Sequence, residues 1–154
     1  MEGEKHHQHQ KWLDESISNG LIRELDALTI RGLQFQHVEK GLLRFKFVIP
    51  EHLSDKDGNW HAGAIAVLID DISVGVVFSS NRRISVSVNF DISYFSPAKI
   101  HEEVEIEGKV VAHKDRLTLV AITITKKDSG EMVAFAKQWM SSTSIQMTLG
   151  SSKL

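Results

Sequence analysis

One carboxylate stands out among the residues that could do chemistry. Residues 61–79 predict a helix of about 17–20 residues, and at about 100° per residue Asp70 lies almost opposite its main apolar stripe. The face around Asp70 is also apolar, and a helix that is apolar all round is buried all round. Buried carboxylates are costly unless they are paired or have a task, so Asp70 is either catalytic or a structural carboxylate that caps or pairs locally. The stripe holds Ile65, Leu68, Ile69, Ile72 and Val76, and the face of Asp70 holds Gly63, Ala66, Val67, Val74 and Val77.

The composition narrows the classes of protein to consider. The chain has 154 residues, 42% of them apolar, which predicts one domain with an ordinary core. A net charge of −2 does not favour nucleic acid or an anionic membrane as a partner. The absence of cysteine excludes disulfides, thiolate metal sites and cysteine nucleophiles, and fits a reducing compartment. No apolar run approaches the roughly 18 residues of a membrane span, and the polar N-terminus does not resemble a secretory signal.

Residues 1–28 predict an N-terminal tail followed by short helices. Residues 1–11 are charged and contain His6, His7 and His9. Clustered histidines can bind metal, but nothing nearby supplies a fixed geometry, so we expect a disordered tail and no metal site. Residues 12–28 have helical apolar spacing, interrupted near Asn19-Gly20.

Residues 29–142 predict one folded domain. A β-hairpin at residues 33–49 precedes the long helix, for which Asp57 and Asn59 are plausible N-caps. The strand after the helix alternates clearly, so Ser87 and Tyr94 are expected to point in opposite directions. One side holds Val86, Val88, Phe90, Ile92 and Tyr94, and the other holds Ser85, Ser87, Asn89, Asp91 and Ser93. One apolar helix between two groups of strands predicts an α+β fold, an antiparallel sheet wrapped around one long central helix. The later strands are expected at residues 85–94, 104–111, 117–125 and 132–140, followed by a flexible tail at 143–154.

The last three residues, Ser152-Lys153-Leu154, match the Ser-Lys-Leu peroxisomal address, which is read at the extreme C-terminus. The preceding residues are small and polar, so a receptor could reach this end. We therefore expect the peroxisomal matrix as the location and the peroxisomal import receptor as a partner.

Three motifs give the chain a recognisable pattern. His61-Ala62-Gly63 opens the helix, Asp70 follows, and one strand ends in Tyr94-Phe95-Ser96-Pro97-Ala98-Lys99. This pattern resembles the hotdog-fold acyl-CoA thioesterases, in the small branch of thioesterase superfamily member 2 and the plant peroxisomal small thioesterases. The likeness covers roughly residues 41–142. It implies a hotdog fold and lipid metabolism as the setting, with CoA as part of the substrate and no separate cofactor.

The resemblance also implies roles for individual residues. Asp70 would be the catalytic carboxylate, Ser87 would orient the attacking water, and the backbone N–H of Ala62, beside Gly63, would polarise the thioester carbonyl. The family has glycine at position 62 and an asparagine where this chain has Asp55. The alanine methyl could crowd the thioester, and Asp55 lacks an amide donor.

Thioester hydrolysis needs an attacking group and donors for the oxyanion, and these lie far apart on one helix. Positions 62 and 70 are separated by about 12 Å at a rise of about 1.5 Å per residue. A carbonyl and its attacking water span only about 3–3.5 Å. Two antiparallel helices would bring Asp70 of one subunit to the helix start of the other. We therefore expect an obligate dimer with two composite sites, paired into a homotetramer as the family suggests.

Other residues have alternative interpretations. Asp71 is expected at an interface or surface, and His61 is either an acid–base group or a helix cap. Ser87 lies among polar residues, so it is either functional or simply exposed. CoA phosphates need cations, for which the candidates are Arg82, Arg83, Lys99, Lys114 and Arg116.

Three functions follow from these residues. The first is an acyl-CoA thioesterase that uses Asp70 as base or nucleophile. The alternative is a catalytically weak acyl-CoA-binding protein, suggested by Ala62 and Asp55. A third hotdog chemistry, such as hydration, would need a catalytic histidine paired with a carboxylate, and the sequence offers no convincing pair.

Overall fold

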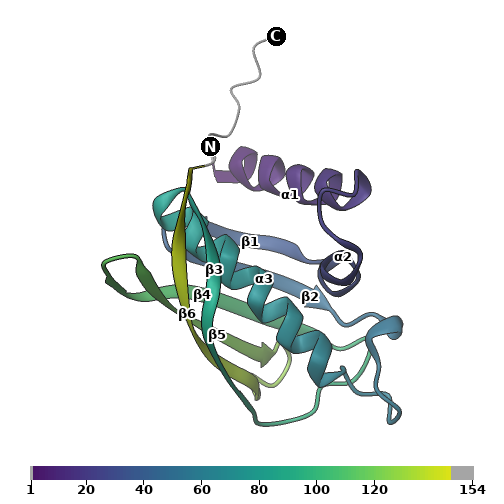
Figure 1. The fold of residues 1–154 in the computed structure, drawn as a ribbon. Coiled ribbons are helices and arrows are strands. Elements are labelled where there is room, and N and C mark those ends of the chain that lie inside the picture. Colours follow the sequence, from purple (N-terminus) through teal and green to yellow (C-terminus); the bar gives the residue numbers. More distant parts are fainter. Residues whose placement is uncertain (1, 147–154) are drawn as a thin grey trace.

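A six-stranded antiparallel sheet curves around one long helix in the computed structural model, which describes residues 2–146 (Figure 1). The strand order is β1-β2-β4-β5-β6-β3, so β1 and β3 form the two edges of the sheet. The predicted α+β fold with a central helix is therefore confirmed. The strands are β1 (Gln34–Glu39), β2 (Leu42–Val48), β3 (Arg83–Tyr94), β4 (Glu103–Lys114), β5 (Leu117–Lys126) and β6 (Met132–Gln146).

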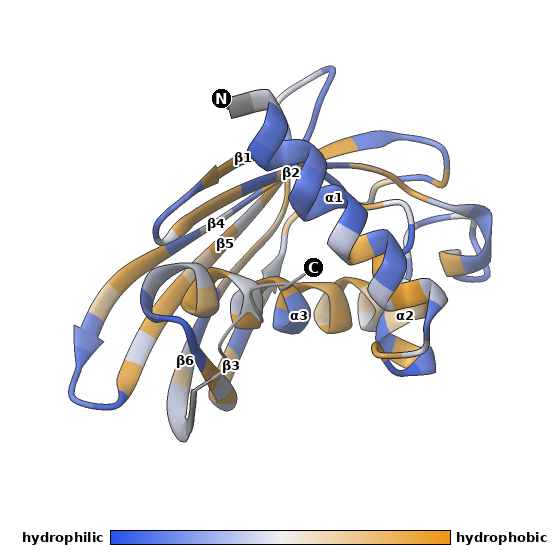
Figure 2. Ribbon diagram, turned by 90° about the horizontal axis from the view of Figure 1, so that it is seen from above, coloured by the Kyte–Doolittle hydropathy of each residue, from blue (hydrophilic) through white to orange (hydrophobic). Residues whose placement is uncertain are grey.

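The central helix α3 (Ala62–Asn81) packs its predicted apolar stripe onto the sheet. Leu68, Ile69 and Val76 are completely buried there, because each faces strands that present apolar side chains. The helix is long and apolar enough to cross a membrane, with a mean hydropathy of 1.8. Its main apolar stripe is instead buried in the core cluster, together with strand residues such as Phe47 and Ile122. Figure 2 shows apolar colouring along α3 and along the strands of the sheet.

The N-terminal region differs from the sequence prediction. Residues 2–11 are not a disordered tail but the first part of α1 (Glu2–Ser18), which contains His6, His7 and His9. The predicted break at Asn19-Gly20 is confirmed, and α2 (Glu24–Ile30) follows it. The charged residues of α1 hid this helix because its apolar spacing begins only near Trp12. A short 3-10 helix, η1 (Glu51–Leu53), precedes α3.

A side chain of α1 covers the edge of the sheet at β1. The Gln10 side-chain amide donates to the Leu33 carbonyl at 3.1 Å and accepts from the Phe35 N–H at 3.1 Å. It thereby takes the place that a neighbouring strand would occupy. The opposite edge, β3, carries exposed apolar side chains: Val86 is 54%, Val88 58% and Tyr94 49% exposed.

The C-terminal strand is longer than predicted. β6 runs from Met132 to Gln146, so residues 143–146 continue the strand where a flexible tail was expected. They pair with the first residues of β3, as Arg83 opposite Gln146 illustrates. The Ser152-Lys153-Leu154 address lies outside the described residues.

Candidate active site

Asp70 lies at the centre of a hydrogen-bonded cluster formed by α3, β3 and β6. The Ser87 hydroxyl donates to Asp70 Oδ1 at 2.5 Å. Gln138 Nε2 also donates to Asp70 Oδ1 and, at 2.8 Å, to Ser87 Oγ. Asp70 Oδ2 makes no hydrogen bond within residues 2–146, so one carboxylate oxygen is held by two donors and the other is free for chemistry.

An irregularity in β3 places Ser87 beside Asp70. The pairing of β3 with β6 shifts register between Ser87 and Asn89, which is a β-bulge. Ser87 and Tyr94 have opposite parity in the sequence, but the bulge turns both toward α3, where each contacts a helix residue. The prediction that they point in opposite directions was therefore wrong.

The start of α3 is fixed by His61 and Tyr94. His61 is the N-cap, and its Nδ1 accepts the Gly63 N–H at 2.9 Å. The cap interpretation of His61 is confirmed, and Asp57 and Asn59 are not the N-cap. The Tyr94 hydroxyl donates to the Ala62 carbonyl at 2.9 Å, and burial raises the pKa of Tyr94 above its usual value.

These contacts leave a specific donor available at the helix start. The Gly63 N–H is occupied by His61, whereas the exposed Ala62 N–H has no acceptor among the described residues. The positive end of the helix dipole lies at the same place. The N–H of Ala62, the position expected to polarise the carbonyl, is therefore the free donor at this end of the helix. Gly63 serves the cap by donating to His61, and glycine suits this position because a Cβ there would approach the His61 ring to 3.1 Å.

Asp55 serves the loop before α3 rather than the carboxylate cluster. Its Oδ1 accepts the backbone N–H of Asp57 at 2.8 Å and of Asn59 at 2.9 Å. The hydrogen bond from Asn59 has the larger effect and the one from Asp57 adds to it, so the pKa of Asp55 is held below its usual value. Asp55 therefore stays ionised and fixes the turn that leads to His61.

Within the described residues, Asp71 makes no hydrogen bond to the cluster, and it lies close enough to Asp26 of α2 for the charge of Asp26 to act on it. It is half-buried, and its Oδ2 is inaccessible to solvent without a hydrogen-bond partner within residues 2–146. Burial raises the pKa of Asp71 to about 7, and the charges of Asp26 and Asp70 add to the effect. Asp71 is thus a carboxyl whose ionised form is disfavoured by burial, and it is not part of the Asp70 cluster.

The candidate phosphate-binding cations divide between the two ends of α3. Arg82 and Arg83 follow its C-terminus. Lys114 ends β4, and Arg116 lies in the turn between β4 and β5. Asn81 donates to Ser142 Oγ at 3.3 Å, and the Ser142 N–H donates to the Arg116 carbonyl at 2.9 Å, which joins these segments. Lys99 lies at the other end, where its bridge to Asn59 places it near the helix start.

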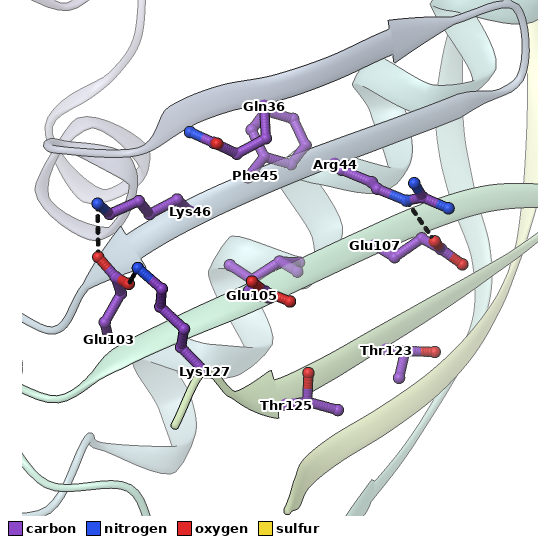
Figure 3. A pocket seen from close by; sticks show the side chains of 11 residues that line it. Gln36, Arg44, Phe45, Lys46, Glu103, Glu105, Glu107, Thr123, Thr125 and Lys127 are labelled. Atoms are coloured by element: carbon purple, nitrogen blue, oxygen red, sulfur yellow. Dashed lines mark hydrogen bonds and ion pairs between the residues drawn. The ribbon is translucent and has the colours of Figure 1, made fainter. Parts of the chain in front are cut away.

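A charged hollow on the outer face of the sheet is separate from this site. Figure 3 shows its side chains on β1, β2, β4 and β5, together with Lys127, which follows β5; α3 lies behind the sheet in this view. Arg44 pairs with Glu107 at 2.7 Å, and Lys46 and Lys127 both pair with Glu103. Because all three cations that line it in the described part of the chain are paired with carboxylates, this hollow is a poor site for an anionic substrate.

Sequence reasoning missed Gln138, although a signal was present. The inward-facing residues of β6 are Ala134, Ala136, Gln138 and Met140, all at most 1% exposed. One amide in an otherwise apolar row indicates a polar contact inside the fold.

Comparison with known proteins identifies the family of this chain. The family model of the thioesterase superfamily matches residues 57–133, half of the chain. Mouse acyl-coenzyme A thioesterase 13 is 33% identical over 87 residues, which are 56% of this chain and 62% of that protein, less than two thirds of its length.

Solved structures match over more of the chain. Mouse thioesterase superfamily member 2 has a TM-score of 0.74 at 24% identity, covering 86% of this chain and 95% of that one. A Streptococcus mutans protein bound to acetyl CoA has a TM-score of 0.69 at 25% identity, covering 75% and 91%. The chain therefore belongs to the thioesterase superfamily and has the hotdog fold that its sequence predicts.

Proposed function

We propose that the protein is an acyl-CoA thioesterase, which hydrolyses an acyl-CoA thioester to a free acid and CoA. The observation that carries this proposal is the Asp70 carboxylate, with Oδ1 held by Ser87 and Gln138 and Oδ2 free. A carboxylate oriented in this way can accept a proton from water or attack a carbonyl. The mouse relative, named as an acyl-CoA thioesterase, and the acetyl-CoA-bound bacterial structure support the same substrate class.

The reaction follows from the two groups that the helix supplies. As a base, Asp70 Oδ2 removes a proton from water while the water oxygen bonds to the thioester carbonyl carbon. As a nucleophile, Asp70 Oδ2 attacks that carbon itself, and the resulting anhydride is then hydrolysed. The negative charge that develops on the carbonyl oxygen is stabilised by the Ala62 N–H at the helix start. Collapse of the intermediate breaks the C–S bond, and CoA leaves as a thiolate that takes up the proton.

The two groups belong to different subunits in this proposal. Within the continuous helix α3, Ala62 and Asp70 are eight residues apart, or roughly 12 Å at about 1.5 Å per residue. That separation is too large for one thioester, which spans about 3–3.5 Å with its attacking group. An antiparallel dimer would bring Asp70 of one chain to Ala62 of the other.

The edges of the sheet support such a dimer. Gln10 covers the edge at β1, whereas β3 has a free edge with exposed Val86 and Val88. Free edges with apolar side chains favour pairing with another chain. The face of α3 that carries Asp70 also holds Val67 and Val74, which are only half-buried. Pairing of two such dimers into a tetramer remains a prediction.

The proposal also covers the CoA phosphates. Arg82, Arg83, Lys114 and Arg116 gather at the C-terminal end of α3. In an antiparallel dimer that end would lie near the start of α3 in the other subunit. Lys99 of that subunit lies near the same helix start. Both chains would therefore supply cations on the same side of each site.

The direct test is thiol release from a panel of acyl-CoA esters. Asp70→Asn is expected to lower kcat by about 10²–10⁴, the range for loss of a general base. Asp71→Asn is the matched control, because it makes the same change one residue away and should keep kcat. Equal rates for wild type and Asp70→Asn would overturn the role of Asp70.

The alternative is an acyl-CoA-binding protein with weak turnover, favoured by the Ala62 methyl and by the engagement of Asp55 in its own loop. The same experiment separates the two functions. Binding of CoA esters without thiol release at any chain length would support the alternative.

Peroxisomal location and recognition by the import receptor remain predictions from Ser152-Lys153-Leu154, which the structure does not describe. Import into the peroxisomal matrix would place the enzyme among acyl-CoA esters of lipid metabolism.

A further inference from the structure

Gln138 is an amide in a place built for apolar side chains. It is completely buried in β6, opposite Val120 of β5 and Phe90 of β3. Its neighbours on the same face, Ala136 and Met140, are apolar and buried. A buried amide is unfavourable unless its polar atoms are satisfied.

The hydrogen bonds of Gln138 satisfy only half of the amide. Nε2 donates to Asp70 Oδ1 and to Ser87 Oγ. Oε1 is buried and has no partner within residues 2–146. Flipping the amide would place Oε1 against the Asp70 carboxylate, so that two acceptors face each other. The orientation with Nε2 toward Asp70 is therefore the favourable one. The fold would be served better by an apolar side chain, since that would leave no acceptor unpaired.

Both N–H groups of Gln138 act on the cluster that contains Asp70. The donation to Ser87 Oγ occupies a lone pair of that oxygen, so the Ser87 proton is directed to Asp70 Oδ1. The two bonds to Oδ1 fix the plane of the carboxylate and leave Oδ2 as its free oxygen. Without Gln138, Ser87 alone would hold Asp70, and a single bond permits rotation about the carboxylate.

We propose that Gln138 is a positioning residue that fixes the Asp70 carboxylate and the Ser87 hydroxyl for hydrolysis. The inference rests on the proposed thioesterase function. Gln138 acts through Asp70 and has no access to substrate, because its side chain is completely buried. It should therefore affect kcat and not the binding of the CoA ester.

The first test is Gln138→Met, which keeps the volume and removes both donors. We expect kcat to fall about 10–100-fold, the scale of a misplaced catalytic group, while KM stays within about twofold. The melting temperature should stay level or rise, because the unpaired Oε1 is removed. Met140→Leu is the control for repacking at the next inward position of β6, and should keep kcat.

The second test is Gln138→Glu, which keeps the shape and makes the donor depend on pH. At pH 8 an ionised Glu would face the Asp70 carboxylate, and kcat should fall at least as far as in Gln138→Met. At lower pH the protonated Glu would donate an O–H to Asp70. The ratio of variant to wild-type kcat should therefore rise at least tenfold between pH 8 and pH 5. A purely structural role would leave this ratio constant.

The third test combines Gln138→Met with Asp70→Asn. If Gln138 acts through Asp70, the double variant should be no slower than Asp70→Asn alone. An active wild type with an equally active Gln138→Met, or a pH-independent ratio for Gln138→Glu, would overturn this inference and leave the proposed function intact. A wild type that releases no thiol from any acyl-CoA would overturn both.

Discussion

Asp71 should limit the stability of the protein above neutral pH. Its carboxyl is half-buried against α2, with Oδ2 unpartnered within residues 2–146. Burial raises the pKa of Asp71 from 3.8 to about 7. Between these two values the folded chain keeps a proton that the unfolded chain loses. The free energy of unfolding therefore falls as the pH rises from about 4 to about 7, and the full penalty is present above pH 7.

The size of this penalty follows from the shift of the pKa. A rise of about 3 units, at about 1.36 kcal/mol per unit, gives an upper limit of about 4 kcal/mol at pH 8. The same relation leaves only about 0.5 kcal/mol at pH 4. Asp71→Asn keeps the shape and removes the charge. It should raise the free energy of unfolding by about 2–4 kcal/mol at pH 8 and by less than about 1 kcal/mol at pH 4.

Urea denaturation at pH 4, 6 and 8 measures this difference, at one fixed protein concentration because association adds to stability. Asp128→Asn, in the exposed β5–β6 turn, is the matched control and should change stability by less than about 0.5 kcal/mol at each pH. The reasoning is refuted if Asp71→Asn destabilises the protein at pH 8 or has the same effect at all three pH values.

Three further outcomes can be checked. Ala62→Pro removes the free N–H, and proline is tolerated at the first position of a helix, so kcat for thiol release should fall about 10²–10³-fold. Ala62→Gly keeps the N–H and should retain activity. Full activity of Ala62→Pro would exclude this donor. His61→Ala should cost about 0.5–2 kcal/mol in urea denaturation through loss of the N-cap, whereas His61→Asn should be close to wild type; equal losses would argue against the cap. A fluorescent protein fused ahead of the chain should collect in peroxisomes, and deletion of Ser152-Lys153-Leu154 should release it to the cytosol; an unchanged pattern would remove the predicted address.

Local sequence patterns predicted most of the helices and strands, because each of these forms from residues that are close together in the chain. The apolar stripe of α3 and the alternation of the strands gave the correct order of helix and sheet. The carboxylate on the second apolar face led directly to Asp70. The sequence also offered the helix cap as one interpretation of His61, because that role depends on its neighbours in the chain.

The remaining features depend on contacts between distant segments. Ser87 lies beside Asp70 only because β3 has a bulge against β6, and alternation within β3 does not reveal it. Gln138 meets a residue 68 positions away, so no local pattern connects the two. The helix at residues 2–11 has little apolar periodicity of its own and is held by the contacts of Gln10 with the edge of β1.

The composite site is tested most directly by mixing two inactive chains. A heterodimer of one Asp70→Asn chain and one Ala62→Pro chain contains a site with both defects and, if the site is shared between subunits, a second site with neither. Differently tagged chains, co-expressed and purified through both tags, should release thiol at about half the wild-type rate, although each homodimer is nearly inactive. A heterodimer as inactive as either homodimer would place Asp70 and Ala62 of one chain in the same site and would contradict the shared site.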